Sequence, residues 1–356
     1  MAGVVTSFAP GRVNLLGEHT DYNEGLALPF AIELGVTVAA QATGDGRADV
    51  VALDLGARDS FELDRPEKVS GWRAFIRGAV AELRRAGVEL TGARLGITGT
   101  VPPGAGLSSS AALEVATLLA LIALADAPEF DRTEVAKLAS RVENEWVGAQ
   151  TGLLDQLASL YGEEGHALRI DFRSLEVTPV ALELDGYLLV TLDSGERHAN
   201  AASGYNQRRA ECAEACRLLG IESLREAAPE QIKRLPDPLD RRARHVMTSN
   251  RRVEEAVAAL REPDFERLAQ LIDACHASLR DDYEVSTPAV EAAVQRLKRA
   301  GALGARLIGG GFGGHVLGLL APDSSPPPGA ASVRPGPGAR VRSAAAGLPH
   351  AGYRAR

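Results

Sequence analysis

The chain has 356 residues, which exceeds one typical domain, so we expect two domains that each bury a hydrophobic core. Its formal net charge of −8 argues against a nucleic-acid surface and favours a small-molecule partner. No apolar run approaches the ~20 residues that cross a bilayer, and the first residues lack the features of a signal peptide, so we expect a soluble, cytoplasmic protein.

The pattern of apolar residues in the first half changes between strand spacing and helix spacing. Apolar and polar residues alternate at 34–42, 48–53 and 93–100, which predicts three strands. Apolar residues recur three to four positions apart at 71–86 and 131–147, which predicts two helices. The first half is therefore expected to mix α and β structure.

The second half is expected to begin with strands and to continue with helices. The strand-like stretches are 166–171, 176–182 and 186–192. Charged and alanine-rich segments then predict helices until about residue 301. We place a domain boundary near residue 175, which gives an N-terminal domain at 1–175 and a C-terminal domain at 176–343.

Proline and glycine dominate the segment PDSSPPPGAASVRPGPG, 322–338, which cannot continue a helix and is expected to be a loop. The overlapping stretch ASVRPGPGARV is expected to supply the remaining edge strand of the second domain. The last residues, 344–356, are mostly small and polar, and we expect them to form a mobile tail.

The segment VPPGAGLSSSAA, 101–112, follows a predicted strand and leads into a helix expected at 109–124. Gly104 and Gly106 allow close backbone approach, and the N–H groups at a helix start favour negative charge. The segment is therefore a candidate phosphate cradle, although it lacks the GxxxxGK[ST] pattern and the lysine of a P-loop. Magnesium would then carry more of the neutralisation, with Ser110 as one oxygen ligand. The alternative is a serine that caps the helix after a turn.

The segment APGRVNLLGEHTD, 9–21, concentrates ionisable side chains near two glycines. Glu18, His19 and Asp21 are the types of group that hold several hydroxyls, because carboxylates accept hydrogen bonds and an imidazole can donate or accept. Arg12 is permanently cationic and suits a position beside a catalytic carboxylate or a moving phosphoryl group. A surface turn is the alternative reading of this segment.

The run GGGFGG, 309–314, is expected between a strand near 305–308 and another that begins at His315. Because ordering so many glycines is costly, such a run is expected where the backbone passes close to a ligand or another loop. The alternative is a flexible turn. We expect His315 to be a strand residue with no catalytic role.

These segments carry a family likeness. APGRVNLLGEHTDY resembles the galactokinase signature, VPPGAGLSSSAALEVA resembles the phosphate loop of the GHMP kinases, and the third glycine run is similar to their last motif. The resemblance implies an α+β, two-domain fold with mixed sheets packed against helices and the active site in the cleft between the domains. It also implies ATP-dependent phosphorylation of the anomeric (C1) hydroxyl of α-D-galactose, the first committed step of galactose catabolism.

Carried over by position, the resemblance implies a nucleotide site, a metal site and a sugar site. The residues that would cradle ATP are Gly104, Ala105, Gly106, Leu107, Ser108, Ser109 and Ser110. Ser110 and Glu143 would bind Mg²⁺, and Asp155 would be the catalytic carboxylate, with Arg12 stabilising charge beside it. The residues implied in galactose binding are Glu18, His19, Thr20, Asp21, Asp155 and Tyr205.

Plainer alternatives remain for these residues and for the chain. Glu143 also fits a solvated helix face, Tyr205 a packing residue, and Asp155 a carboxylate at a helix N-terminus. The alternative functions are a GHMP kinase for another sugar or small alcohol, and a galactose-sensing regulator built on the kinase fold. Because Arg12, Asp155 and the loop serines are all present, we expect an enzyme. We expect a monomer with galactose and ATP as its partners, and leave an oligomer open.

Overall fold

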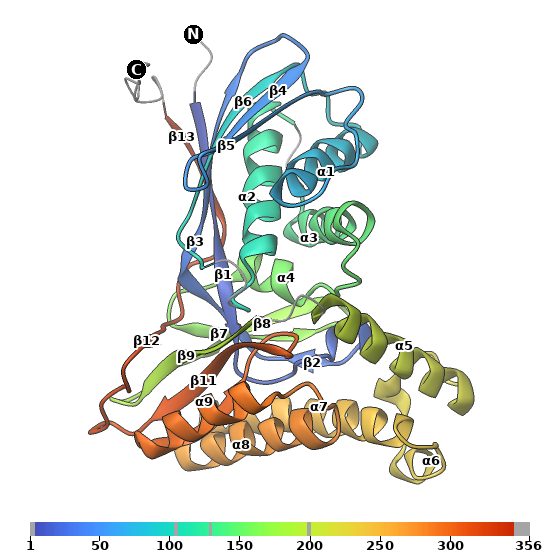
Figure 1. Ribbon diagram of the computed structural model, residues 1–356, viewed down its shortest axis with the longest axis vertical. Coiled ribbons are helices and arrows are strands. Elements are labelled where there is room, and N and C mark those ends of the chain that lie inside the picture. Colours follow the sequence, from blue (N-terminus) through green and yellow to red (C-terminus); the bar gives the residue numbers. More distant parts are fainter. Residues whose placement is uncertain (1–3, 103–105, 128–129, 198–200, 345–356) are drawn as a thin grey trace.

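The computed structural model describes the chain except for residues 1–3, 103–105, 128–129, 198–200 and 345–356. Figure 1 shows a tall upper part, where helices cover one face of a long sheet, and a broad lower part, where helices run beneath further strands. The architecture is α+β, as predicted. Within the described residues, no helix combines the length and apolarity needed to cross a membrane.

The upper part is built on a six-stranded sheet. Its strands are β1 (Val4–Asn14), β3 (Pro29–Ala42), β4 (Arg47–Ala52), β5 (Ala57–Glu62), β6 (Ala93–Gly99) and β13 (Arg340–Ala344). They are ordered β13-β1-β3-β6-β4-β5, and all neighbours are antiparallel except β4 and β6. Burial alternates along β4, which explains its period-two pattern. The three strands predicted in the first half are confirmed.

Four helices cover one face of this sheet (Figure 1). They are α1 (Trp72–Arg85), α2 (Ser109–Leu124), α3 (Arg132–Arg141) and α4 (Leu154–Tyr161). α2 is apolar around most of its circumference, and it therefore lies at the centre, in contact with β1, β3 and the other three helices. α3 continues into a π-helical turn, Val142–Val147. The helices predicted at 71–86, 109–124 and 131–147 are confirmed.

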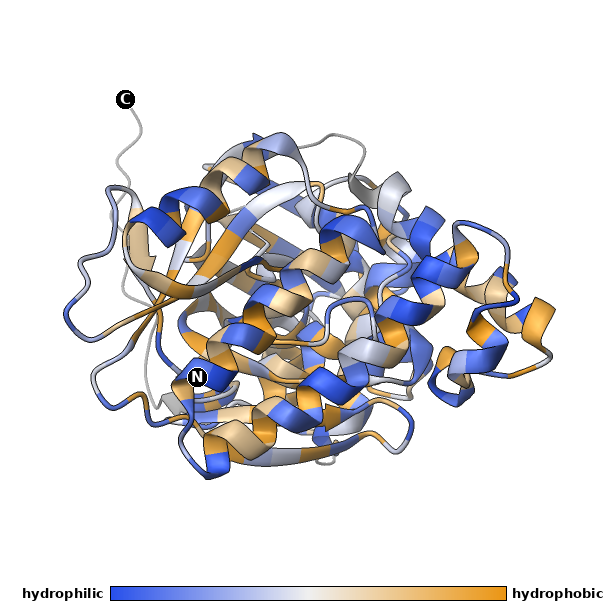
Figure 2. Cartoon of the chain, turned by 90° about the horizontal axis from the view of Figure 1, so that it is seen from below, coloured by the Kyte–Doolittle hydropathy of each residue, from blue (hydrophilic) through white to orange (hydrophobic). Residues whose placement is uncertain are grey.

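The lower part combines a four-stranded sheet with a layer of helices. Its strands are β9 (Leu188–Arg197), β10 (Ala302–Leu307), β11 (Gly313–Leu320) and β12 (Ala330–Ser332). Its helices are α5 (Ala201–Leu219), α6 (Pro229–Ile232), α7 (Leu239–Arg261), α8 (Phe265–Asp281) and α9 (Pro288–Arg299). The sheet has the antiparallel order β10-β11-β9-β12, with α8 and α9 packed against it. Seen from below in Figure 2, the helices are banded in polar and apolar colours, as amphipathic helices should be.

A small third sheet connects the two parts. It consists of β2 (Leu26–Ala27), β7 (His166–Asp171) and β8 (Glu176–Ala181), in the order β2-β7-β8. Short 3₁₀ turns lie at Asp21–Asn23 and Leu224–Glu226. Because β7 and β8 form an antiparallel pair, the boundary expected near residue 175 falls inside a hairpin.

The segment after β11 forms one strand more than was predicted. The expected edge strand is present as β12, at the edge of the lower sheet, but residues 340–344 form a further strand. This strand, β13, returns to the upper sheet and pairs with β1, so that Val4 lies opposite Ala344. Apart from Ala344, the expected mobile tail at 344–356 lies outside the described residues.

The buried apolar side chains of the described residues form two clusters. One lies between the six-stranded sheet and α1 to α4, and the other fills the lower part. The lower cluster also contains Leu15, Leu28 and Phe30, which belong to the N-terminal segment. The beginning of the chain is therefore packed into the lower core, and this contact places the N-terminal signature at the junction of the two parts.

Candidate active site

A cavity of about 170 Å³ lies at this junction. It is lined by Arg12, Asn14, Glu18, His19, Asp21, Thr151, Gly152, Leu154, Asp155, Tyr205, Gly309 and Gly310. These residues come from the end of β1 and the turn after it, the start of α4, the first turns of α5, and the glycine run between β10 and β11. The volume is below the ~300 Å³ of drug-sized pockets and suits a small polar ligand.

Two glycines bring these segments together. A Cβ on Gly152 would collide with the Asp21 carboxylate, and a Cβ on Gly11 would collide with the carbonyl oxygen of Leu107. Glycine at position 11 lets the signature strand run directly beside the serine-rich loop, and Arg12 N donates to Leu107 O at 3.1 Å. The two motifs that are far apart in sequence thus share one wall.

Asp155 is held by two groups from different segments. Arg12 donates from Nε to Asp155 Oδ1 at 2.8 Å, and its Nη2 lies 2.6 Å from the same oxygen. Ser108 Oγ donates to Asp155 Oδ2 at 2.6 Å, and Arg12 Nη1 donates to Gly106 O at 2.6 Å. The carboxylate is therefore fixed in orientation at the first turn of α4, between the signature strand and the serine-rich loop.

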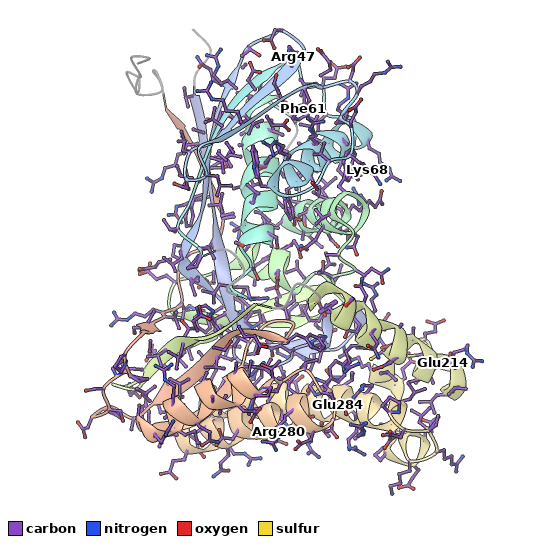
Figure 3. All side chains as sticks on the ribbon, viewed as in Figure 1. Arg47, Phe61, Lys68, Glu214, Arg280 and Glu284 are labelled. Carbon is purple, nitrogen blue, oxygen red and sulfur yellow. The ribbon has the colours of Figure 1, made fainter. Side chains whose placement is uncertain are left out.

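Glu18 is paired with an arginine from the second half of the chain. Its carboxylate contacts Arg306 Nη2, and Gly309 N donates to Glu18 Oε1 at 3.3 Å. Burial raises the pKa of Glu18 above its ordinary value, and the guanidinium of Arg306 limits this rise. Charged side chains such as Lys68 and Glu214 lie at the outer edge of the molecule in Figure 3, whereas this ion pair is enclosed.

His19 lies in the cavity wall with both ring nitrogens already engaged. Its Nε2 lies 3.2 Å from Gly310 O, and because a carbonyl oxygen only accepts, we assign the proton to Nε2. Its Nδ1 therefore accepts from Tyr22 Oη at 2.8 Å. Burial lowers the pKa of His19 to about 3, so the ring is neutral near pH 7. The Tyr205 ring packs beside it, with 4.9 Å between ring centroids.

Asp21 and Tyr205 also line the cavity. Burial raises the pKa of Asp21 to about 6, and the negative charge of Asp155 adds to this shift. Burial also raises the pKa of Tyr205 well above its ordinary value, and the negative charge of Asp21 adds to this shift. The Tyr205 hydroxyl therefore keeps its proton and can donate a hydrogen bond. The wall thus offers carboxylate acceptors together with a phenolic donor, which suits a polyol.

The start of α2 faces a second acidic cluster. Ser110 Oγ donates to Glu143 Oε1 at 3.2 Å. Glu143 Oε2 accepts from Thr151 Oγ1 at 2.8 Å and from Gln156 Nε2 at 3.0 Å, and Gln156 Nε2 also donates to Glu114 Oε2 at 3.3 Å. Glu143 lies in the π-helical turn, a feature that occurs frequently at functional sites.

The oxygen donors of this cluster fit a divalent cation. Burial raises the pKa of Glu143, and the charge of Asp155 adds to the shift; burial and then the charge of Glu143 raise the pKa of Glu114. A bound cation would relieve this excess of negative charge. Among the described residues there is no group of three or more His, Cys, Asp or Glu side chains able to hold a metal alone. Mg²⁺ commonly binds through one or two carboxylates together with substrate phosphates, and Glu143 with the neighbouring Ser110 hydroxyl offers oxygen ligands of this kind.

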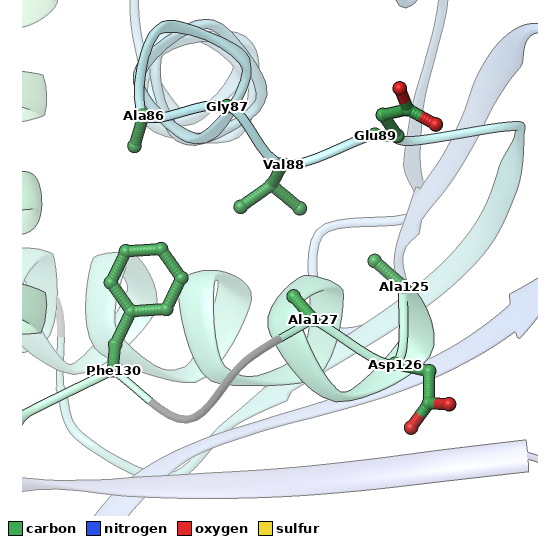
Figure 4. Close-up of a pocket in the computed structure, with 8 residues that line it drawn as sticks. All are labelled: Ala86, Gly87, Val88, Glu89, Ala125, Asp126, Ala127 and Phe130. Atoms are coloured by element: carbon green, nitrogen blue, oxygen red, sulfur yellow. The ribbon is translucent and has the colours of Figure 1, made fainter.

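A larger cavity, of about 420 Å³, is lined by residues that follow the C-terminal ends of α1 and α2 (Figure 4). Val88 and Phe130 face each other across it, between the ends of α1 and α2. Because α2 has 16 residues, it is roughly 24 Å long, and the cavity lies at the end opposite Ser110. Its described lining includes the carboxylates of Glu89 and Asp126 but no arginine, histidine or tyrosine, so we place the chemistry in the smaller cavity.

The remaining predicted site residues fall into three groups. Thr20 does not line the cavity, and its Oγ1 lies 2.8 Å from both Gly17 O and Leu26 O, where it fixes the turn. Leu107 is buried, whereas Ser109 is half-buried at the start of α2. Gly104 and Ala105 lie outside the described residues. Of the residues predicted to bind the nucleotide, the structure therefore describes those from Gly106 to Ser110.

Comparisons with known proteins agree with this geometry. The galactokinase galactose-binding signature matches residues 2–42, and the GHMP kinases N terminal domain and the GHMP kinases C terminal match residues 74–163 and 256–334. A galactokinase of Mycobacterium tuberculosis is 45% identical over 323 residues, with 88% of each chain covered. This chain belongs to the galactokinase family. A galactokinase of Thermotoga neapolitana is 42% identical over 310 residues, with 87% of each chain covered.

The fold of the chain is similar to solved structures of a galactokinase and of a mevalonate kinase. The structure of Lactococcus lactis galactokinase complexed with galactose has a TM-score of 0.88 and 33% identity, with 95% of each chain covered. The mevalonate kinase of Methanococcus jannaschii has a TM-score of 0.64 and 19% identity, over 91% of this chain and 92% of that one. At that identity the second likeness shows a shared fold alone.

Asn14 and Arg306 are among the residues at this galactokinase cavity that sequence reasoning missed. Asn14 lines the cavity, and it follows Arg12 by two positions, so the alternation of side chains along a strand could have indicated it. Arg306 is fully buried next to Glu18. The sequence indicated it only in that a charged residue stands in a strand whose other residues are small or apolar. Such a residue usually has a buried partner, but the sequence does not say which one.

Proposed function

We propose that this chain catalyses ATP-dependent phosphorylation of the anomeric C1 hydroxyl of α-D-galactose to galactose 1-phosphate, the first committed step of galactose catabolism. The observation that carries the proposal is the arrangement of the cavity. It combines Asp155, fixed by Arg12 and Ser108, with the carboxylates of Glu18 and Asp21. Family membership supports the same activity, with ATP as the co-substrate.

In the proposed complex, the sugar lies along the wall of carboxylates. Glu18 and Asp21 accept hydrogen bonds from sugar hydroxyls, and Tyr205 packs against the sugar from α5. His19 forms part of the wall through its ring, because its two nitrogens already bind Tyr22 and Gly310. Asp155 then faces the anomeric end of the sugar, next to the serine-rich loop, where the phosphates of ATP are held.

The transfer itself forms a bond between the anomeric oxygen and the γ-phosphorus, and it breaks the bond from that phosphorus to the β–γ bridging oxygen. ADP leaves with the bridging oxygen, and Asp155 takes the proton of the hydroxyl. Because the transition state of phosphoryl transfer is loose, positioning and charge stabilisation matter more than a strong base. Arg12 supplies both, since it orients Asp155 and brings a positive charge to the site.

We propose that Ser110 and Glu143 hold Mg²⁺ together with the phosphates of ATP. The support is the oxygen-rich cluster around Glu143, in which burial and neighbouring charge raise the pKa of the carboxyls. When bound there, the cation neutralises phosphate charge. We further propose a monomeric, cytoplasmic enzyme.

The decisive experiment is a screen of alcohol acceptors with ATP and Mg²⁺, following ADP release in a coupled assay. Galactose, glucose, galactosamine, mevalonate and homoserine are compared, and the phosphorylated product is identified by its phosphorus NMR signal. We expect turnover with galactose and a product phosphorylated at C1. Preference for mevalonate or homoserine, or sugar binding with no turnover, would overturn the proposal and would favour another GHMP kinase or a sugar-sensing regulator.

A further inference from the structure

We propose that Arg306 is a positioning residue for galactose binding, which acts by holding Glu18 ionised and correctly oriented. The inference rests on the proposed function, because it assigns to Glu18 the role of accepting sugar hydroxyls. It concerns a residue on β10, remote in sequence from the signature that contains Glu18.

The guanidinium of Arg306 is fixed at every nitrogen. Its Nη2 contacts Glu18 Oε2, its Nη1 donates to Leu15 O at 2.6 Å, and its Nε donates to Leu307 O at 2.9 Å. Its side chain is 0% exposed. The planar fork therefore has one defined orientation, between the backbone that follows β1 and the backbone of β10, and it imposes that orientation on the Glu18 carboxylate.

The rest of Glu18 is held by groups from the lower part of the molecule. Gly309 N donates to Glu18 Oε1 at 3.3 Å, and His245 Nε2 donates to Glu18 O at 3.1 Å. Glu18 itself is 3% exposed, yet it lines the cavity. A carboxyl so enclosed would take up a proton if it had no cation beside it, because burial penalises the charged form.

The protonation state of Glu18 decides what it can offer a sugar. An ionised carboxylate only accepts, so it can bind hydroxyl protons, whereas a protonated carboxyl donates from one oxygen. Arg306 is charged at all accessible pH values, and it therefore keeps Glu18 in the accepting form. A purely structural ion pair would not change which form of Glu18 meets the sugar. The pH dependence of galactose binding therefore distinguishes the two roles of Arg306.

The other groups near Glu18 cannot replace Arg306. Among the described residues, Arg12 on β1 is the second cation that acts on Glu18, but it is already bound to Asp155 and Gly106. From α8, the Cys275 thiol faces the pair, and burial raises its pKa, so it stays neutral. From α7, His245 is neutral as well, because burial lowers its pKa to about 3. Arg306 is thus the cation that sets the ionisation of Glu18.

The test compares galactose binding by Arg306→Met and Arg306→Lys with the unmodified enzyme, by calorimetric titration from about pH 6 to 9. We expect Arg306→Met to weaken binding by about 10- to 100-fold near pH 7, the range for hydrogen bonds to charged groups. Its affinity should recover as the pH rises above 7 and Glu18 ionises, while the unmodified enzyme, in which Asp21 titrates near pH 6, binds equally from about pH 7 to 9. Arg306→Lys should recover part of the affinity, because it restores the charge without the fork.

Steady-state kinetics and a matched control separate positioning from general stability. For Arg306→Met we expect a higher KM for galactose with kcat changed by less than about 3-fold, because a binding contact has been lost. The control is Arg242→Met, which removes another buried, ion-paired arginine outside the cavity. It should lower stability without changing the affinity for galactose. Arg306→Met with normal affinity and a flat pH profile would refute the inference.

A double variant keeps the test decisive if Arg306→Met fails to fold. Glu18→Gln with Arg306→Met leaves no unpaired buried charge, and we expect it to bind galactose as weakly as Glu18→Gln alone. A further tenfold loss in the double variant would show that Arg306 acts independently of Glu18, against the inference. Absence of galactose binding by the unmodified enzyme would instead refute the proposed function, so the two failures are distinguishable.

Discussion

Asp155 illustrates how much of the proposed chemistry depends on individual atoms. One carboxylate oxygen accepts from Arg12 and the other from Ser108, so the group cannot rotate freely. A fixed carboxylate can take a proton from an attacking hydroxyl without first reorganising. Its neighbours therefore matter as much as its own charge, and Ser108 connects it to the loop assigned to the phosphates.

The first prediction concerns Asp155→Asn. The amide keeps the shape of the side chain but cannot accept the proton, so we expect kcat to fall by about 100-fold or more, with folding unchanged. The measurement is ADP release at saturating galactose, with circular dichroism as the check on folding. Asp126→Asn, at the distant cavity, is the matched control and should be fully active. Near-normal turnover of Asp155→Asn would contradict the role of general base.

The second prediction concerns Asp21, whose pKa is raised to about 6 by burial and then by the charge of Asp155. Because the ionised form accepts hydrogen bonds, galactose affinity should rise as the pH increases from about 5 to 7, while Asp21 loses its proton. In Asp21→Asn this part of the pH profile should disappear. Calorimetric titrations at a series of pH values provide the measurement, and an unchanged profile in the variant would rule out Asp21 as its source.

At the scale of elements, the active site is built at the ends of strands and helices. β1 ends with Arg12 and Asn14, α4 begins with Asp155 in its first turn, and the glycine run joins β10 to β11. The end of β1 is held by the serine-rich loop, as the bond from Arg12 N to Leu107 O shows. β13 lies at the edge of the upper sheet and, among the described strands, pairs only with β1. Its removal therefore tests how far the pairing of β1 stabilises the molecule.

The third prediction compares two truncations. Removal of residues 340–356 deletes β13 and exposes the edge of β1, the strand that carries Arg12, so we expect lower stability and a tendency to aggregate. Removal of residues 345–356 keeps β13 and should leave the thermal midpoint unchanged within a few degrees. Thermal unfolding and light scattering are the measurements. Equal stability of the two truncated chains would show that β13 contributes little.

At the scale of the whole molecule, local patterns predicted the elements better than their partners. The bounds of α2 follow from a continuous apolar segment after the serines, and the three strands of the first half follow from alternation. The return of β13 to β1 was not predictable, because pairing between residues more than 300 positions apart leaves no local pattern. Likewise the sequence indicated Glu18, but it did not indicate that Arg306 is its partner.

The same contrast applies to the roles within the site. Motifs indicated Arg12, Glu18 and Asp155, and the structure places all three at one cavity. The sequence could not reveal that both nitrogens of His19 are engaged by Tyr22 and Gly310, because these contacts depend on the packing of distant segments. Residue type and spacing therefore predicted which residues gather here, whereas their hydrogen-bond partners required the folded chain.

The fourth prediction concerns cooperativity. Since the N-terminal segment is packed into the lower core and the cavity draws residues from both parts, we expect a single unfolding transition that galactose shifts upward. At a galactose concentration 100 times the Kd, the stabilisation should be about 2.7 kcal/mol. Differential scanning calorimetry with and without galactose is the measurement. Two separate transitions, of which galactose moves one, would contradict this expectation.

The pairing of Val4 with Ala344 has a practical consequence for protein engineering. Both ends of the described chain lie at one corner, at the top of Figure 1, away from α4 and α5, whose first turns line the cavity. Affinity tags or fluorescent labels attached at either end should therefore leave catalysis intact. A short flexible linker between the ends would create a circularly permuted enzyme, whose new termini could be opened in an exposed loop.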